Sequence, residues 1–165
     1  MQNKILDWCF KLKDGLKIVE SNERLSRAYL EQAKSSLLRA EKNLDDNDLL
    51  WSTVAIYYSE YYALYSFLQK IGVKCENHTC SILLVSLLLG EEKTKTINQH
   101  KSKRIDAQYY MKTDQESKIK IMLREAKLFV LYFDEFVSGL NDKDIKNYRE
   151  IVFKNNVKMC DLYKI

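Results

Sequence analysis

The feature that most constrains the fold of this chain is its scarcity of turn-forming residues. The 165 residues include no proline and only four glycines. Proline and glycine interrupt helices and mark the turns of many-stranded β proteins, so their scarcity favours long uninterrupted helices. The length suits one domain with a single sizeable core. We therefore expect an all-α fold, organised as a single domain over residues 1–165.

Apolar residues recur at three- and four-residue steps along most of the chain, which is the pattern of amphipathic helices. We expect an up-and-down bundle of four or five helices, with its core at about residues 22–138 and short helices appended at both ends. The predicted helices cover residues 3–13, 22–44, 49–71, 77–89, 94–107, 114–138 and about 142–155.

Polar residues stand where several of these helices are expected to begin. Asp48 is a candidate cap for the helix that follows it, and Asn77 or Thr79 for the next one. Thr113 and Glu116 have the spacing of a capping box, which predicts the start of the longest helix. That helix is expected to turn these residues inward: Ile119, Met122, Ala126, Phe129, Val130, Phe133 and Val137.

The four cysteines, Cys9, Cys75, Cys80 and Cys160, are too few for a disulfide scaffold in a chain of this length. No stretch reaches the roughly 18 uninterrupted apolar residues of a membrane span, and the first residues lack the cleavage site of a secretory signal. We therefore expect a cytoplasmic protein with reduced thiols and no membrane association. Cys75, His78 and Cys80 give an incomplete zinc ligand set, so we expect no metal and no cofactor.

A basic segment that ends at Arg104 is the candidate anion-binding surface. Four lysines and His100 precede Arg104 without an intervening acid, and the next acidic residue is Asp106. Arg104 suits phosphate because a guanidinium stays charged and donates paired hydrogen bonds. His100 lies four residues earlier and shares a helix face with it. Together with Lys101 and Lys103, they form either a phosphate-binding strip or a solvated helix face.

The predicted helix over residues 49–71 carries five tyrosines inside an apolar sequence. Aromatic residues at helical spacing usually pack, so we expect these tyrosines in the core and at a dimer contact. Glu60 is expected either to face solvent, the favoured alternative, or to face inward and pair with Arg104. His78 either packs against the tyrosine helix or joins Arg104 in a polar seam.

Motifs along about residues 5–138 follow a recognisable order. They are Asp7-Trp8-Cys9, Ala28-Tyr29-Leu30 with Ala33, Trp51, Tyr57-Tyr58, Tyr61-Tyr62, Gly72, His78, Arg104 with Ala107 and Tyr109, and Ala126 with Phe129-Val130. Together these motifs resemble the HEPN superfamily. The resemblance is closest to small prokaryotic HEPN proteins that are often encoded beside a minimal nucleotidyltransferase.

This resemblance implies a bundle of four or five helices that pairs as a homodimer, with Arg104 near the dimer seam. It also implies a minimal nucleotidyltransferase and RNA as partners. Many members of the superfamily are metal-independent endoribonucleases that carry an Arg and, after four to six intervening residues, a His. Here the corresponding positions hold Tyr109, Tyr110 and Met111. The chain therefore departs from the nuclease pattern at the expected imidazole.

The resemblance leaves two functions open. The first is a component of a nucleotidyltransferase-linked toxin–antitoxin or stress module that binds RNA or nucleotide phosphate through Arg104. If this component cleaves RNA without metal, its catalytic residues are expected to be Arg104, Tyr109 and His78. Tyr109 is a poor base because its unperturbed pKa is about 10. The alternative is a catalytically inactive homodimeric interaction module.

Overall fold

The computed structural model describes the backbone of residues 2–160 and the side chains of residues 6–155. The described part of the chain is almost entirely helical, which confirms the predicted all-α class. Its elements are α1 Gln2–Lys11, β1 Lys17–Ile18, α2 Glu23–Asp45, α3 Leu49–Lys70, β2 Val73–Lys74, α4 His78–Leu89, the 3-10 helix Glu91–Lys93, α5 Lys95–Tyr110, α6 Glu116–Gly139 and α7 Asp142–Cys160.

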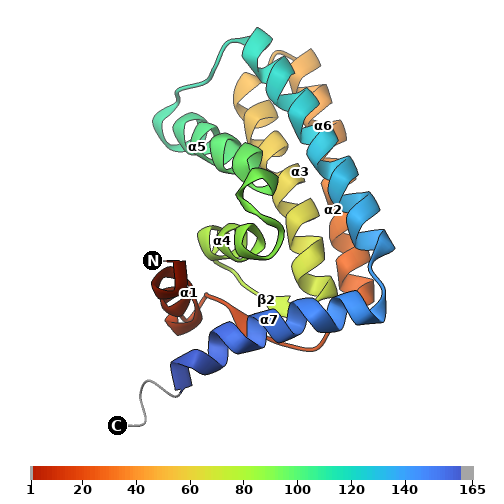
Figure 1. Cartoon of the computed structure of the whole chain (residues 1–165). Coiled ribbons are helices and arrows are strands. Elements are labelled where there is room, and N and C mark those ends of the chain that lie inside the picture. Colours follow the sequence, from red (N-terminus) through yellow and green to blue (C-terminus); the bar gives the residue numbers. More distant parts are fainter. Residues whose placement is uncertain (1, 161–165) are drawn as a thin grey trace.

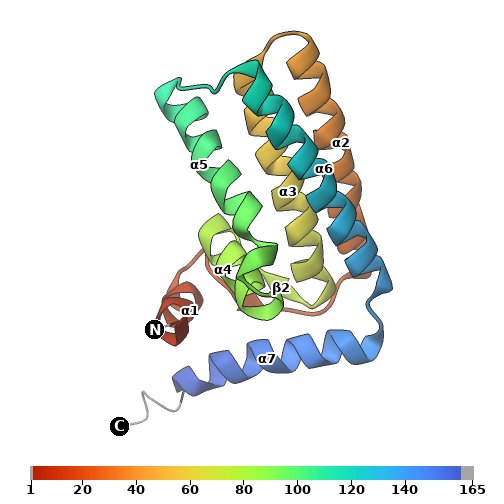
Figure 2. The ribbon, with the colours of Figure 1, turned by 45° about the horizontal axis from the view of Figure 1, so that its top comes forward.

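Helices α2, α3 and α6 pack side by side as the long part of the bundle (Figure 1). Helix α5 lies along α3 on the other side, and α4 crosses near one end (Figures 1 and 2). The two-residue strands β1 and β2 pair antiparallel near this end. Each described helix is too short or too polar to cross a membrane.

The core forms where α3 meets its neighbours. Ser59 and Ala63 are fully buried, and such small side chains let the backbones of adjacent helices approach closely. Helix α6 follows the predicted periodicity without exception. Its buried residues include all seven of the expected positions: Ile119, Met122, Ala126, Phe129, Val130, Phe133 and Val137.

Two of the predicted helix caps are present. The Asp48 carboxylate accepts a hydrogen bond from the backbone N–H of Trp51 at 3.1 Å, at the start of α3. The Asn77 side chain accepts one from the backbone N–H of Cys80 at 3.2 Å, at the start of α4. Asn77, rather than Thr79, is therefore the cap, and it places the next two residues in the first turn of α4.

The predicted capping box of α6 is wrong. The helix begins at Glu116, and Gln115 precedes it without a side-chain capping bond. Asp114, expected inside the helix, lies in the preceding loop, where its carboxylate binds the ammonium of Lys103 at 2.8 Å. This ion pair fixes the loop before α6, and no capping bond from Thr113 is present in the described part of the chain.

The prediction of reduced thiols is wrong for two cysteines. Cys9 and Cys80 form a disulfide between α1 and α4, with their Cα atoms 5.5 Å apart. Helix α1 packs against α4, so residues separated by 71 positions in the sequence face each other. Cys75 is a buried free thiol, and the side chain of Cys160 lies outside the described residues.

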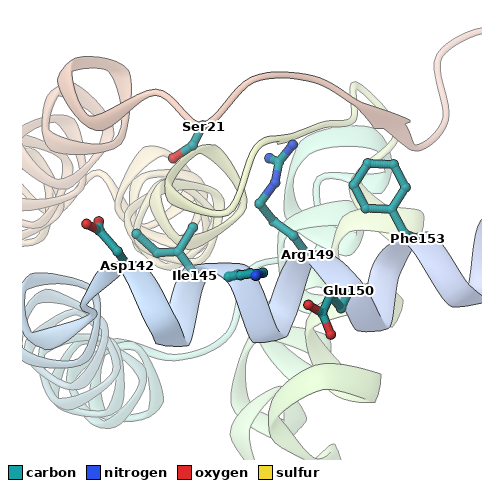
Figure 3. Close-up of a pocket in the computed structure, with 7 residues that line it drawn as sticks. Ser21, Asp142, Ile145, Arg149, Glu150 and Phe153 are labelled. Atoms are coloured by element: carbon teal, nitrogen blue, oxygen red, sulfur yellow. The ribbon is translucent and has the colours of Figure 1, made fainter.

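Helix α7 crosses the end of the bundle (Figure 2). Its Arg149 points toward the segment before α2 (Figure 3) and donates hydrogen bonds to the carbonyls of Val19 at 3.0 Å and Ile71 at 2.8 Å. Gly72 has a φ of +72°, and a Cβ there would lie 1.8 Å from the Arg149 guanidinium. A cavity of about 410 Å³ between α7 and Ser21 contains none of the predicted site residues.

Candidate functional site

Arg104 projects from α5 toward the tyrosines of α3. It is 9% exposed, and its Cζ lies 4.8 Å from the ring centroid of Tyr57 and 5.9 Å from that of Tyr58. One guanidinium nitrogen donates to the side chain of Gln108 at 3.2 Å, while the buried Nε has no hydrogen-bond partner. Among the described residues, no carboxylate pairs with it. A buried charge without a counterion is unfavourable, so an anion bound here would stabilise Arg104.

His78 occupies the first turn of α4 beside Arg104. Its Nδ1 shares a hydrogen bond of 2.7 Å with the Tyr57 hydroxyl, and its ring stacks on that of Tyr61 with centroids 3.7 Å apart. Burial, followed by the charges of Arg104 and Lys101, lowers the pKa of His78 to about 4. The imidazole is therefore neutral at neutral pH. Its Nε2 has no hydrogen-bond partner in the part of the chain that the structure describes.

Lys101 lies one turn before Arg104 on α5 and adds a second positive charge. Its ammonium donates a hydrogen bond to the hydroxyl of Thr79 in α4. Burial and the charge of Arg104 lower the pKa of Lys101. The N-terminus of α4 contributes a partial positive charge of its own. We call Arg104, Lys101, His78, Thr79 and Tyr57 the cationic cluster.

A second cluster, the glutamate cluster, consists of His100, Glu60 and Glu125. The two ring nitrogens of His100 bind Glu60 at 2.8 Å and Glu125 at 3.1 Å. Burial alone would lower the pKa of His100, but the two carboxylates outweigh it and raise that pKa. Burial raises the pKa of Glu60, which is fully buried. Glu60 therefore faces inward, against the favoured expectation, and pairs with His100 rather than with Arg104.

The remaining predicted site residues lie apart from Arg104. Lys103 is ion-paired with Asp114 in the loop before α6. Tyr109 is 67% exposed near the end of α5, and Gln108 is the neighbour that contacts Arg104. Both ring nitrogens of His100 are occupied by carboxylates. The structure thus brings together three of the predicted site residues: Arg104, Lys101 and His78.

Two members of the cationic cluster were not expected from the sequence. Tyr57 was assigned to the core, and its hydroxyl bonds to a residue 21 positions away. Thr79 was considered only as a helix cap. The one available signal was the cap at Asn77, because a helix that starts there places His78 and Thr79 in the same first turn. Burial raises the pKa of Tyr57, which keeps its hydroxyl protonated.

A family model described as HEPN domain matches residues 26–137 of the chain. Comparison with curated proteins and with solved structures finds no match. The matched segment extends from α2 to α6 and contains both the cationic cluster and the glutamate cluster. Helices α1 and α7 lie outside it.

Proposed function

The chain belongs to the HEPN domain family, and on this premise we propose that it binds phosphate groups of RNA at the cationic cluster. The observation that carries this proposal is the buried guanidinium of Arg104, which has no carboxylate partner among the described residues. A phosphate supplies the missing negative charge and can accept paired hydrogen bonds from a guanidinium. Lys101 and the N-terminus of α4 support an anion at the same place.

The same proposal includes the oligomeric state of the protein and its partner. The protein acts as a homodimer with Arg104 near the dimer seam, as part of a toxin–antitoxin or stress module with a minimal nucleotidyltransferase. This part is supported by the order of the motifs along the chain and by the family match.

The cationic cluster also provides groups for RNA cleavage without metal. In the tautomer that carries its proton on Nδ1, His78 donates a hydrogen bond to the Tyr57 hydroxyl. Its Nε2 is then free to take the proton of a ribose 2′-hydroxyl. The 2′-oxygen then attacks phosphorus, and the bond to the 5′-oxygen breaks as Lys101 donates a proton to it. Arg104 stabilises the charge on the phosphorane oxygens. A bound phosphate adds negative charge beside His78, which raises the pKa of this base.

A catalytically inactive binding module is the second candidate. It is favoured by Tyr109, Tyr110 and Met111, which occupy the positions where the superfamily's nucleases carry a histidine. It is favoured also by the low pKa of His78, about 4, because a weak base accepts a proton less readily. In this function the cationic cluster binds RNA without cleaving it, and the exposed ring of Tyr109 is free to stack on a base.

Binding and cleavage can be tested with one labelled single-stranded RNA in the presence of EDTA. We expect Arg104→Ala to weaken binding roughly 10- to 100-fold, the loss typical of a hydrogen bond to a charged group. Lys103→Ala is the matched control, because this neighbour on α5 is already paired with Asp114. It should change affinity by no more than about twofold.

Cleavage by the wild type that is lost in His78→Gln while binding persists would identify the nuclease. Binding without cleavage would identify the inactive module. Equal losses in Arg104→Ala and Lys103→Ala would contradict a specific phosphate site, and so would unchanged binding in both. Melting temperatures of the three variants show whether any loss reflects unfolding.

A further inference from the structure

A separate cavity of about 220 Å³ lies between α2 and α3. The proposed phosphate site uses none of its side chains except Tyr58, whose ring borders both. Three aromatic rings and three polar side chains line most of it: Trp51, Tyr58, Tyr62, Gln32, Arg39 and Asn43. Benzene occupies a cavity of about 150 Å³ in another protein. The cavity, which is open to solvent, therefore has room for one aromatic heterocycle.

The polar side chains of this cavity are accessible: Gln32 and Arg39 are exposed, and Asn43 is half-buried. Within the described residues, the side chains of Gln32, Arg39 and Asn43 form no hydrogen bond or ion pair with the protein. Side-chain amides pair with the donor and acceptor edges of bases, and a guanidinium can bind an acceptor edge or stack on a ring. Trp51, which lines the cavity, is 53% exposed. Aromatic faces beside free amides are the combination that recognises an unpaired base.

Tyr58 joins this cavity to the cationic cluster. Its ring centroid lies 5.9 Å from Cζ of Arg104 and 5.8 Å from the ring centroid of Tyr62. A nucleotide with its phosphate at Arg104 therefore has the ring of Tyr58 within reach of its base. The cavity is lined along α3 from Tyr58 back to Trp51.

We propose that the cavity between α2 and α3 binds an unpaired nucleobase of the RNA strand whose phosphate lies at Arg104. This inference rests on the proposed phosphate site and names its ligand as single-stranded RNA. In a duplex the bases are stacked and paired, so they cannot enter a cavity of this size. The aromatic walls provide affinity that depends little on which base enters, and the amides of Gln32 and Asn43 provide a preference among bases.

Trp51 provides a direct probe, because the chain has only one other tryptophan, Trp8. In a Trp8→Phe background, the full-length protein is titrated with a short single-stranded RNA and with an abasic strand of equal length. We expect the RNA to quench Trp51 fluorescence and to bind about tenfold more tightly than the abasic strand. Binding of both strands is also followed by fluorescence anisotropy of a strand label, which does not require Trp51.

Variants separate the base cavity from the phosphate site. Trp51→Ala should make the two strands bind equally, with the affinity of the abasic strand. Leu38→Ala is the matched control, since it removes an exposed apolar side chain of α2 that does not line the cavity. It should preserve the tenfold difference. Arg104→Ala should weaken the binding of both strands by the same factor.

The outcomes are distinguishable. Equal binding of RNA and abasic strand by the parent protein, with both weakened in Arg104→Ala, would overturn the base cavity and leave the phosphate site standing. If Arg104→Ala changes the affinity of neither strand while Trp51→Ala abolishes the preference for RNA, the cavity is supported and the phosphate site is overturned. A duplex that binds as tightly as the single strand would overturn the cavity. Failure of both strands to bind would overturn both proposals.

Discussion

The two histidines of this chain lie in clusters of opposite character on neighbouring surfaces of α3. His100 has a carboxylate on each ring nitrogen, and these carboxylates raise its pKa. His78 has a tyrosine hydroxyl on one nitrogen and two cations nearby, and its pKa is lowered to about 4. Both side chains are at least partly buried. The difference in pKa therefore arises from the charges around each ring as much as from burial.

This comparison distinguishes a cluster that is balanced from one that is not. The glutamate cluster contains its own counterions, so it can connect α3, α5 and α6 without a ligand. The cationic cluster brings together the charges of Arg104 and Lys101 and the start of α4. Among the described residues, no carboxylate pairs with these charges. Charge imbalance inside a fold is unfavourable unless a ligand corrects it. The imbalance is the basis of the proposed phosphate site, and the following changes test it.

The largest effect on stability is expected from removing the buried carboxylate of the glutamate cluster. Glu60→Leu leaves His100 with one half-exposed carboxylate and should lower the free energy of unfolding by about 3–5 kcal/mol, the usual cost of breaking a buried pair. Urea unfolding monitored by circular dichroism measures it. Glu125→Gln is the control, with an expected loss below about 1 kcal/mol because Glu125 lies near solvent. A larger loss in the control would contradict the buried pair.

The two histidines should respond to pH with opposite signs. The pKa of His78 is about 4 in the folded protein against 6.5 for an ordinary histidine. Between these values only the unfolded chain takes up the proton, so stability falls as pH falls from 6.5 to about 4. The contribution is on the order of 3 kcal/mol. His100, with its raised pKa, instead contributes stability below its unfolded pKa that is lost as pH rises through its folded pKa.

This prediction is checked by urea unfolding of the wild type and of His78→Gln across the acidic range. The variant should lose less stability on acidification than the wild type. Identical pH dependence in the two proteins would show that His78 is not held neutral by its surroundings. Nuclear magnetic resonance of the imidazole protons assigns the two titrations separately.

A carboxylate introduced into the cationic cluster should give it a counterion of its own, as the glutamate cluster already has. Thr79→Glu places a negative charge beside Lys101, in the first turn of α4, where it should stabilise the free protein by up to about 1 kcal/mol. The same charge competes with phosphate, so RNA affinity should fall about tenfold. Thr79→Gln controls for side-chain size. A carboxylate that left RNA binding intact would place the binding site elsewhere.

The smallest effect tests the link between Tyr57 and His78. Tyr57→Phe removes the hydroxyl that bonds Nδ1 but keeps the ring beneath Arg104. The expected cost is about 1 kcal/mol of stability, measured by urea unfolding. Tyr58→Phe is the matched control, because its hydroxyl has no hydrogen-bond partner among the described residues. Equal effects would mean that the hydrogen bond contributes nothing specific.

Much of the fold could be predicted because periodicity is a local signal. The inward residues of α6 repeat at helical steps, and all seven are buried. The start of α6 was misplaced because Asp114 binds Lys103, a residue on another helix. The disulfide was missed for the same reason: its two cysteines are 71 residues apart, and only the packing of α1 on α4 brings them together.

The candidate site could be predicted only in part. The charge and geometry of a guanidinium make Arg104 a candidate phosphate ligand without any structure. The partners of the histidines could not be identified, because Glu60 precedes His100 by 40 residues and Tyr57 precedes His78 by 21. Helix spacing places His100 and Arg104 on one face, but it does not reveal that a carboxylate from α3 already occupies the histidine.

The bond between Cys9 and Cys80 has a consequence for fragments of this protein. Most of the first half of the chain, including α2 and α3, lies within the loop that this bond closes. A protease that cuts the backbone once inside that loop leaves two pieces joined through sulfur. Such pieces migrate together in a denaturing gel until a reductant separates the piece that carries α1 from the piece that carries α4.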